Sequence, residues 1–196
     1  MSDTHPNTEL YALGKGRLSI ALWSDTDGPS DTTDFVDVGN CPSFEIEPVV
    51  EKLEHFSSRS GARVKDKIVV VERKYTLTFE LDEISAANMA KFMLGTISGA
   101  EVRGLMNLDA EYAVKFISDN VTGRNYTVRF WKVNLNPNGA FQLIGDEWMT
   151  MSFTGEGLSD STNHATSPYY TFTFTTTSTT SSTTSTTSSS TTSTTN

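Results

Sequence analysis

Alternation of apolar and polar residues with a period of two is the dominant pattern of the chain. It is clear in FEIEPVV from residue 44, in YTLTFELDEI from residue 75 and in MTMSFTGEG from residue 149. Such alternation indicates antiparallel strands with one face on a core and the other in a polar environment. Further strands are predicted in GRLSIALW, AEYAVKFISDN, YTVRFWKVNL and, after the turn signal NPNG, in AFQLIG. The predicted fold is therefore mainly β, an antiparallel sandwich or barrel.

One segment instead has the period of a helix. ISAANMAKFML, residues 84–94, places apolar residues at helical spacing, and these are Ala86, Met89, Ala90 and Met93. Ser85 or Asp82 is a suitable N-cap, and Gly95 is a suitable end. We expect a single helix that packs Met89 and Met93 against the sheet.

The end of the chain differs in composition from the rest. Every residue from Thr175 to Thr195 is Ser or Thr. We therefore divide the chain into a β-domain, residues 1–160, and a low-complexity tail, residues 161–196. Within SPYYTFTF the aromatic residues alternate with threonine, which predicts a strand that anchors the tail on the body or on a neighbour.

Composition argues against several classes of function. The net charge is −9, from 15 basic and 24 acidic residues, which is unfavourable for holding DNA by its phosphates. Cys41 is the only cysteine, so an intrachain disulfide is excluded. No secretory signal precedes the first strand, and no apolar run approaches the length of a membrane span. We expect a protein made in a cytoplasm.

No pattern in the sequence indicates an enzyme. The three histidines are scattered, and no nucleophile elbow, phosphate-binding loop or zinc-ligand spacing occurs. The acidic segment 24–37 departs from the calcium-loop pattern and is interpreted as a solvated loop. We predict no catalytic residue, no metal site and no cofactor.

Residues 51–67, EKLEHFSSRSGARVKDK, form an unusually long link between two predicted strands. A hairpin needs only about two to five linking residues. Five basic and three acidic residues give this link a charge of 5 − 3 = +2, so the rest of the chain carries −9 − 2 = −11. A basic arm on an acidic body favours docking onto another copy, and a head-to-tail contact generates rings or open filaments.

The order of these features resembles the tail tube proteins, or major tail proteins, of long-tailed bacteriophages. The resemblance spans about residues 11–158 and is distinctive from Val38 to Leu94. It comprises a Gly-Asn-x-Pro lead-in at residues 39–42, a strand with alternating acids, EHFSSRSG in the link, a strand ending in FELDEI, and a helix containing Asn88.

The resemblance implies a structural virion protein whose rings, usually hexameric, stack into a hollow tube. The sheets of the subunits join around the lumen, and the arm reaches a neighbouring subunit or ring. The expected arm contacts are His55, Phe56, Arg59, Arg63, Lys65 and Lys67. The expected lumen face comprises Glu45, Glu47, Thr76, Thr78, Glu80 and Asp82, whose negative charge lets DNA slide without adhering.

The implied partners are further copies of the chain, a tape-measure protein, tail terminator and distal tail proteins, and passing DNA. The implied location is the virion tail, after synthesis in the bacterial host. Two alternatives remain open: a secretion-system tube protein, and a carbohydrate-binding or adhesive β-sandwich module. The sugar-binding alternative predicts a monomer with exposed tryptophans, whereas a tube protein predicts polymers with Trp23, Trp131 and Trp148 buried.

Overall fold

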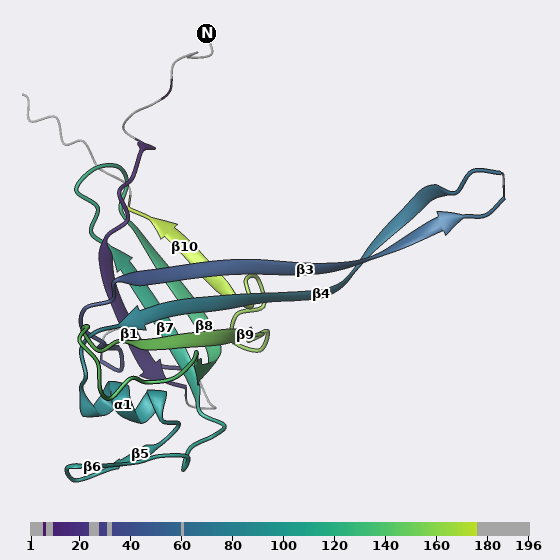
Figure 1. Ribbon diagram of the computed structural model, residues 1–196. Helices are drawn as coiled ribbons and strands as arrows, with labels where there is room; N and C mark the ends of the chain where they lie inside the picture. The colour runs from purple at the N-terminus through teal and green to yellow at the C-terminus, as the bar shows by residue number, and fades with distance from the viewer. Residues whose placement is uncertain (1–5, 7–9, 24–27, 31–32, 60, 176–196) are drawn as a thin grey trace, which may run out of the picture.

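The computed structural model describes residues 6, 10–23, 28–30, 33–59 and 61–175. These residues form a mainly β, antiparallel structure with one helix, as the alternation predicts (Figure 1). The elements are β1 (Gly16–Leu22), β2 (Val36–Asp37), β3 (Ser43–Ser57), β4 (Val64–Leu81), α1 (Ala86–Phe92), β5 (Thr96–Ser98), β6 (Glu101–Arg103), β7 (Glu111–Ser118), β8 (Tyr126–Pro137), β9 (Met151–Leu158) and β10 (Tyr170–Phe174). The Ser/Thr tail beyond residue 175 lies outside the described residues.

One sheet with the order β2-β1-β7-β8-β9-β4-β3 folds over to make two layers, while β5 and β6 pair separately. The back layer contains β2, β1, β7, the first half of β8, and β10; the front layer contains the second half of β8, β9, β4 and β3 (Figure 1). β8 belongs to both because Tyr126–Phe130 pair with β10 and Lys132–Pro137 pair with β9. The strand predicted in SPYYTFTF is thus confirmed as β10, within the body.

Alternation places one set of side chains between the layers. Leu77, Phe79 and Leu81 of β4 are fully buried, whereas the residues between them face outward. Phe79 stacks on Phe153 of β9 with ring centroids 4.9 Å apart. Phe44 of β3 lies 5.4 Å from the Phe116 ring in the back layer, so aromatic contacts join the two layers.

Helix α1 closes one end of the sandwich. Ser85 is its N-cap, as predicted, and accepts a hydrogen bond from the Asn88 backbone. The Asn88 side chain is buried and donates to the backbone oxygens of Val38 (2.8 Å) and Glu83 (3.1 Å). The amide therefore ties the helix to the segment that leads into β3.

The Gly-Asn lead-in meets the same corner. The Asn40 side chain donates to Asp82 at 2.6 Å, and its backbone N–H donates to Glu83 at 3.0 Å. Gly39 has φ of +86°, and a Cβ there would lie 2.2 Å from the Glu83 carboxyl carbon. Residues about 40 positions apart in the sequence thus form one polar clamp.

The helix packs Met89 and Met93 against the core, as expected, although both are only partly buried and its most buried residues are Asn88, Ala90 and Phe92. Two predictions about local structure are wrong. AFQLIG is not a strand, because β8 continues to Pro137 and the next strand begins at Met151. Most of the link 51–67 is not a loop: β3 continues to Ser57 and β4 starts at Val64.

Candidate assembly surface

β3 and β4 extend well beyond the body as a two-stranded arm (Figure 1). We call residues 51–71 the distal hairpin. The seven residues from Glu51 to Ser57 alone span about 23 Å at about 3.3 Å per residue. The register shifts at Glu51/Lys52 and again at His55/Phe56, and irregularities of this kind bend the ribbon and increase its twist. The arm is therefore a structured projection.

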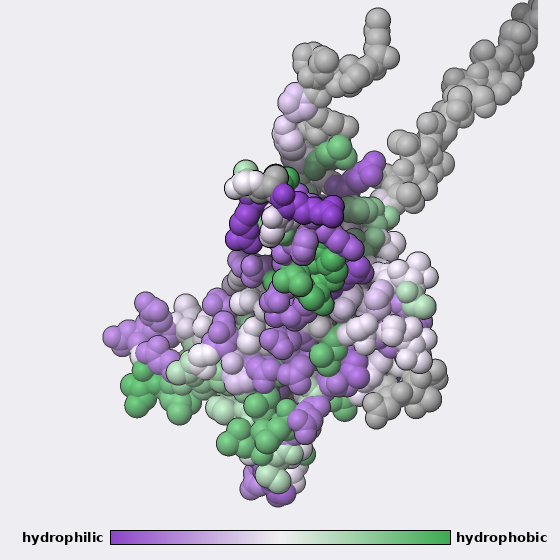
Figure 2. Space-filling view, turned by 90° about the vertical axis from the view of Figure 1, so that its right-hand side faces the viewer, coloured by the Kyte–Doolittle hydropathy of each residue, from purple (hydrophilic) through white to green (hydrophobic). Residues whose placement is uncertain are grey.

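The distal hairpin exposes apolar side chains on both faces. The cross-strand pair Leu53 and Val69 lies on one face, whereas Val70 opposite Lys52 and Ile68 opposite Glu54 lie on the other. Relative exposures range from 41% to 65% for the apolar residues of the arm: Val50, Leu53, Val64, Ile68, Val69, Val70 and Val71. In Figure 2, which looks toward the projecting arm, hydrophobic surface lies among strongly hydrophilic groups. Contiguous exposed apolar surface of this kind marks an interaction site.

Four of the six predicted arm contacts come together at the tip. The Phe56 ring lies 5.0 Å from the Arg63 guanidinium and 5.8 Å from the Lys65 ammonium. Lys65 also pairs with Glu54, and His55 Nδ1 lies 2.6 Å from Asp66 Oδ1. These contacts hold an aromatic ring under cationic groups.

The remaining basic side chains of the arm are open to solvent. Arg59 and Lys67, together with Lys52, are exposed and make no ion pair with any described residue. The tip therefore presents uncompensated positive charge.

The residues predicted for the lumen share one face of the front layer. Glu45 lies opposite Thr78, Glu47 opposite Thr76, and Ser43 opposite Glu80, all on the face away from the core. Asp82 follows β4 and is engaged by Asn40. The geometry thus brings the set together; which side of an assembly this face meets stays a prediction.

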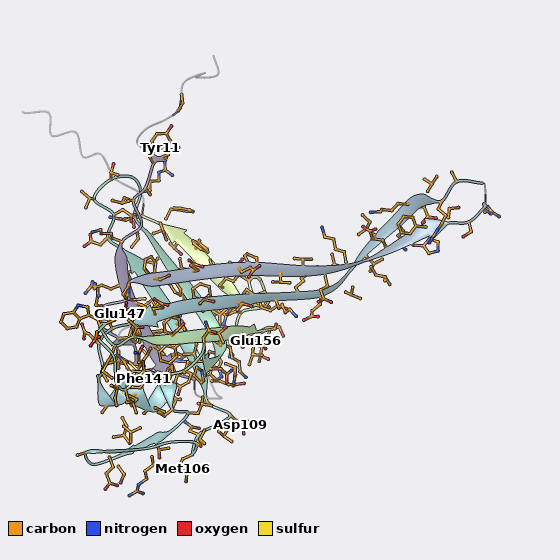
Figure 3. The ribbon with its side chains drawn as sticks, viewed as in Figure 1. Tyr11, Met106, Asp109, Phe141, Glu147 and Glu156 are labelled. Atoms are coloured by element: carbon orange, nitrogen blue, oxygen red, sulfur yellow. The ribbon has the colours of Figure 1, made fainter. Side chains whose placement is uncertain are left out.

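The polar face continues onto strands that the sequence prediction left out. On β9, Thr154 lies opposite Thr78 and Glu156 opposite Thr76, and Figure 3 shows Glu156 beside β4. On β8, Asn134 continues the row opposite Glu156. We call Glu45, Glu47, Glu80 and Glu156 the acidic stripe. The alternation of TMSFTGEG was the signal that Glu156 belongs to it.

Glu111 and Lys132 border this face and form an ion pair, with Lys132 Nζ 2.8 Å from Glu111 Oε2. A second cation, Lys74 of β4, lies on this face two residues before Thr76, and its Nζ is 3.1 Å from Glu72 Oε1. Lys74 and Lys132 thus each pair with a carboxylate outside the acidic stripe.

The tryptophans do not follow the prediction of core burial. Trp148 lies in the loop between β8 and β9 and is 94% exposed. Trp131 is half-buried, stacks on His164 with centroids 3.6 Å apart, and donates its indole N–H to the Ser167 oxygen. Trp23 is half-buried as well. The expectation that all three are buried is therefore wrong.

In the part of the chain that the structure describes, no group of three or more His, Cys, Asp or Glu residues is arranged to hold a metal ion. The acidic segment 24–37 lies partly outside the described residues. Among the described elements, no helix has the length and apolar character needed to cross a membrane.

A family model matches most of the chain. The segments 11–103 and 98–173 match the model of a family described as "Protein of unknown function UCP028589". The chain belongs to this family. Together the two matched segments include the distal hairpin, the acidic stripe, the helix and β10 up to Thr173. No curated protein matches the chain significantly.

Proposed function

We propose that the chain is a self-assembling structural protein, the tail tube subunit of a long-tailed bacteriophage. In this proposal, rings, usually hexameric, stack into a tube that conducts DNA during ejection. The observation that carries it is the distal hairpin, a long arm with apolar side chains on both faces and a basic tip. The resemblance in the order of sequence features from residue 38 to 94 is the reason for proposing a phage tube among self-assembling proteins.

The physical argument concerns the stability of the arm. A two-stranded ribbon with no layer against either face is marginal in water. Burying its apolar side chains against a neighbour yields about 25 cal/mol for each Å² removed from water. The body is stabilised by the packing of its own two layers, whereas the arm would gain comparable stability by docking onto a neighbour.

The acidic stripe supports the conduit part of the proposal. A wall of carboxylates repels DNA phosphates, so DNA passes without the Lys and Arg contacts that create affinity. The partners in this proposal are copies of the chain, a tape-measure protein that fills the lumen before ejection, terminator and distal tail proteins, and DNA. The protein acts as a component of the virion tail and has no enzymatic activity.

Negative-stain electron microscopy of concentrated protein tests the proposal. We expect hollow tubes with a regular axial repeat from the native chain. The quadruple variant R59E/R63E/K65E/K67E is expected to stay folded and monomeric, because the tip then repels an acidic neighbour. The matched control R59K/R63K/K65R/K67R keeps the charge and is expected to form tubes. Normal tubes from the charge-reversed chain would contradict the assigned role of the arm.

A carbohydrate-binding module is the second candidate, and one observation favours it. Trp148 is 94% exposed, and an exposed indole is a suitable platform for a sugar ring. A glycan-binding screen of the native chain beside W148A tests this candidate. Binding that W148A abolishes, from a protein that stays monomeric at every concentration, would replace the tube proposal.

A further inference from the structure

The back layer carries an inward-facing apolar row that reaches past the front layer. Leu18 lies opposite Phe116, Phe116 opposite Val128, and Val128 opposite Phe172, across β1, β7, β8 and β10. We call these four residues the apolar floor. Phe172 is 44% exposed, although it faces the inside of the sandwich. The front layer ends at β3, so the floor is covered only in part.

The uncovered part is a cleft. Its volume is about 210 Å³. Phe44 and Ile46 of β3 form one wall, the apolar floor lies beneath, and Gly14–Gly16 form the opposite lip. Cys41 and Pro42 lie at the entrance.

Strand edges border the cleft. Among the described strands, β3 pairs only with β4 and β10 pairs only with β8. The unpaired backbone edge of a strand is a template for a further strand. A strand added beside β3 would widen the front layer by about 4.8 Å and lie over the floor. The cleft therefore has the features of a vacant strand position.

We propose that the distal hairpin of a second copy occupies this cleft, with one of its strands paired to the free edge of β3. This inference rests on the proposed function and names the surface that receives the arm. The contact is head-to-tail, because each copy offers its arm at one place and its cleft at another.

Charge and shape favour the arm as the occupant. Glu45 and Glu47 lie on the outer face of β3, next to the strand edge that borders the cleft, and residues 51–67 of the arm carry a charge of +2. Lys15 on the opposite lip is the cation that faces the cleft. The arm also supplies what a strand position over an apolar floor requires, namely paired strands with apolar side chains on both faces.

Other cavities of the molecule fit the arm less well. The one at the base of the arm is lined by Arg73 and Lys74, which repel a basic tip. The one between α1 and β1 is lined by Lys91 and Asp34 and has no free strand edge comparable in length to β3. The cleft beside β3 combines apolar surface, free backbone groups and neighbouring carboxylates.

Cross-linking between engineered cysteines tests the proposal. All variants carry C41S, so no native thiol interferes. P42C places a thiol at the exposed entrance, and S57C places one near the tip of the arm. Assembled P42C/S57C protein is treated with a short bismaleimide and separated by denaturing electrophoresis. We expect a ladder of dimers, trimers and higher multimers, because each copy is linked at both sites.

The controls separate this contact from others. Cross-linking of the S57C variant alone can give no product larger than a dimer. The S98C/S57C variant carries its second thiol on the exposed β5 and tests whether any accessible pair of thiols gives a ladder. A mixture of P42C chains and S57C chains is expected to give only mixed dimers. V64C, opposite Ser57 in the arm, replaces S57C if that variant does not fold.

Each outcome decides between the inference and the proposed function. Tubes that give the ladder with P42C/S57C and not with S98C/S57C support the docking site. Tubes without a ladder overturn it and leave the proposed function standing. A third outcome is a within-chain cross-link in P42C/T186C together with no ladder from P42C/S57C. This outcome would place the Ser/Thr tail in the cleft, and it would also overturn the proposed docking of the arm. If neither the native chain nor the C41S parent forms tubes, the proposed function fails and this inference fails with it.

Discussion

The two halves of the hairpin β3–β4 have opposite environments. In the half within the body, Leu77 and Phe79 of β4 are completely buried. In the distal half, Val70 and Val71 of the same strand remain 41% and 64% exposed. Both halves of β4 contain β-branched residues, so a high strand propensity does not by itself bury a side chain.

The difference is the layer against which each half packs. The body half lies over the back layer, whereas no layer formed by the described residues packs on either face of the arm. The comparison teaches that one strand can be a core element along part of its length and an interaction surface along the rest. Alternation identifies the strand, and only the neighbouring elements decide which role each part has.

The largest expected effect lies in the body half. Phe79→Ala removes a fully buried ring that stacks on Phe153, and we expect a loss of about 3–5 kcal/mol in the free energy of unfolding. Denaturant unfolding followed by circular dichroism measures it. A loss below about 1 kcal/mol would contradict the assignment of this half to the core.

Thiol reactivity compares the two halves directly. Burial raises the pKa of Cys41, at the entry to β3, to about 11 from an ordinary 9.0. At pH 8 its thiolate fraction is then about 100-fold below that of an ordinary thiol. We expect iodoacetamide to alkylate native Cys41 about 100-fold more slowly than the arm cysteine of C41S/S57C, as followed by mass spectrometry.

The pH dependence of this thiol has a definite sign. Because the pKa of Cys41 is raised in the folded state, the protonated thiol contributes to the free energy of unfolding. This contribution is fully present below pH 9 and is lost as the pH rises toward 11. The C41S variant lacks this dependence. Equal alkylation rates for the two positions at pH 8 would show that Cys41 is not shielded.

A smaller effect is expected where the helix meets the body half. Asn88→Ala leaves the buried Val38 oxygen and the partly buried Glu83 oxygen without the amide donor, which costs about 1–3 kcal/mol. Thermal unfolding measures the change. Ala87→Gly, at a less buried position of the same helix, is the control, since it costs about 1 kcal/mol through helix propensity alone. A loss no greater than that of the control would contradict the anchoring role of the amide.

The smallest effect on stability belongs to the arm. Ile68→Ala with Val70→Ala changes exposed side chains, so we expect the unfolding free energy of the monomer to change by less than about 0.5 kcal/mol per site. Tube formation, followed by light scattering, is expected to need a higher protein concentration. Unchanged assembly together with a large loss of stability would show that the arm residues stabilise the monomer rather than contact a neighbour.

The sequence predicts the fold class well because the body strands alternate without interruption. It fails at the arm for a physical reason: the register shifts near Glu51 and His55 change the phase of the alternation, and the charged residues between them resemble a loop. AFQLIG has the composition of a strand, yet β8 and β9 pair directly around it. Trp131 turns outward where β8 crosses between layers, since Phe130 and Val133 on either side both face the core.

The candidate assembly surface is also predictable from the sequence only in part. The acidic residues of β3 share a face, and so do the polar residues of β4, because side chains at positions i and i+2 of a strand point to the same side of the sheet. The alternation of β9 places Glu156 on the polar face of its own strand, but its position beside Thr76 depends on the pairing of β9 with β4, which the local pattern does not specify. The cleft arises from where the front layer ends, a property of the whole sheet order. Such features depend on contacts between distant segments, so a reading of single segments misses them.

The shared strand β8 has a consequence for the order of events during synthesis. The arm lies in the first half of the chain, whereas β10, which pairs with β8 and supplies Phe172, is the last described strand to leave the ribosome. The chain is synthesised from its N-terminus, so a nascent chain contains the arm residues before its own cleft has a complete floor. In the proposed docking, a copy can therefore receive the arm of another only after its own synthesis is complete.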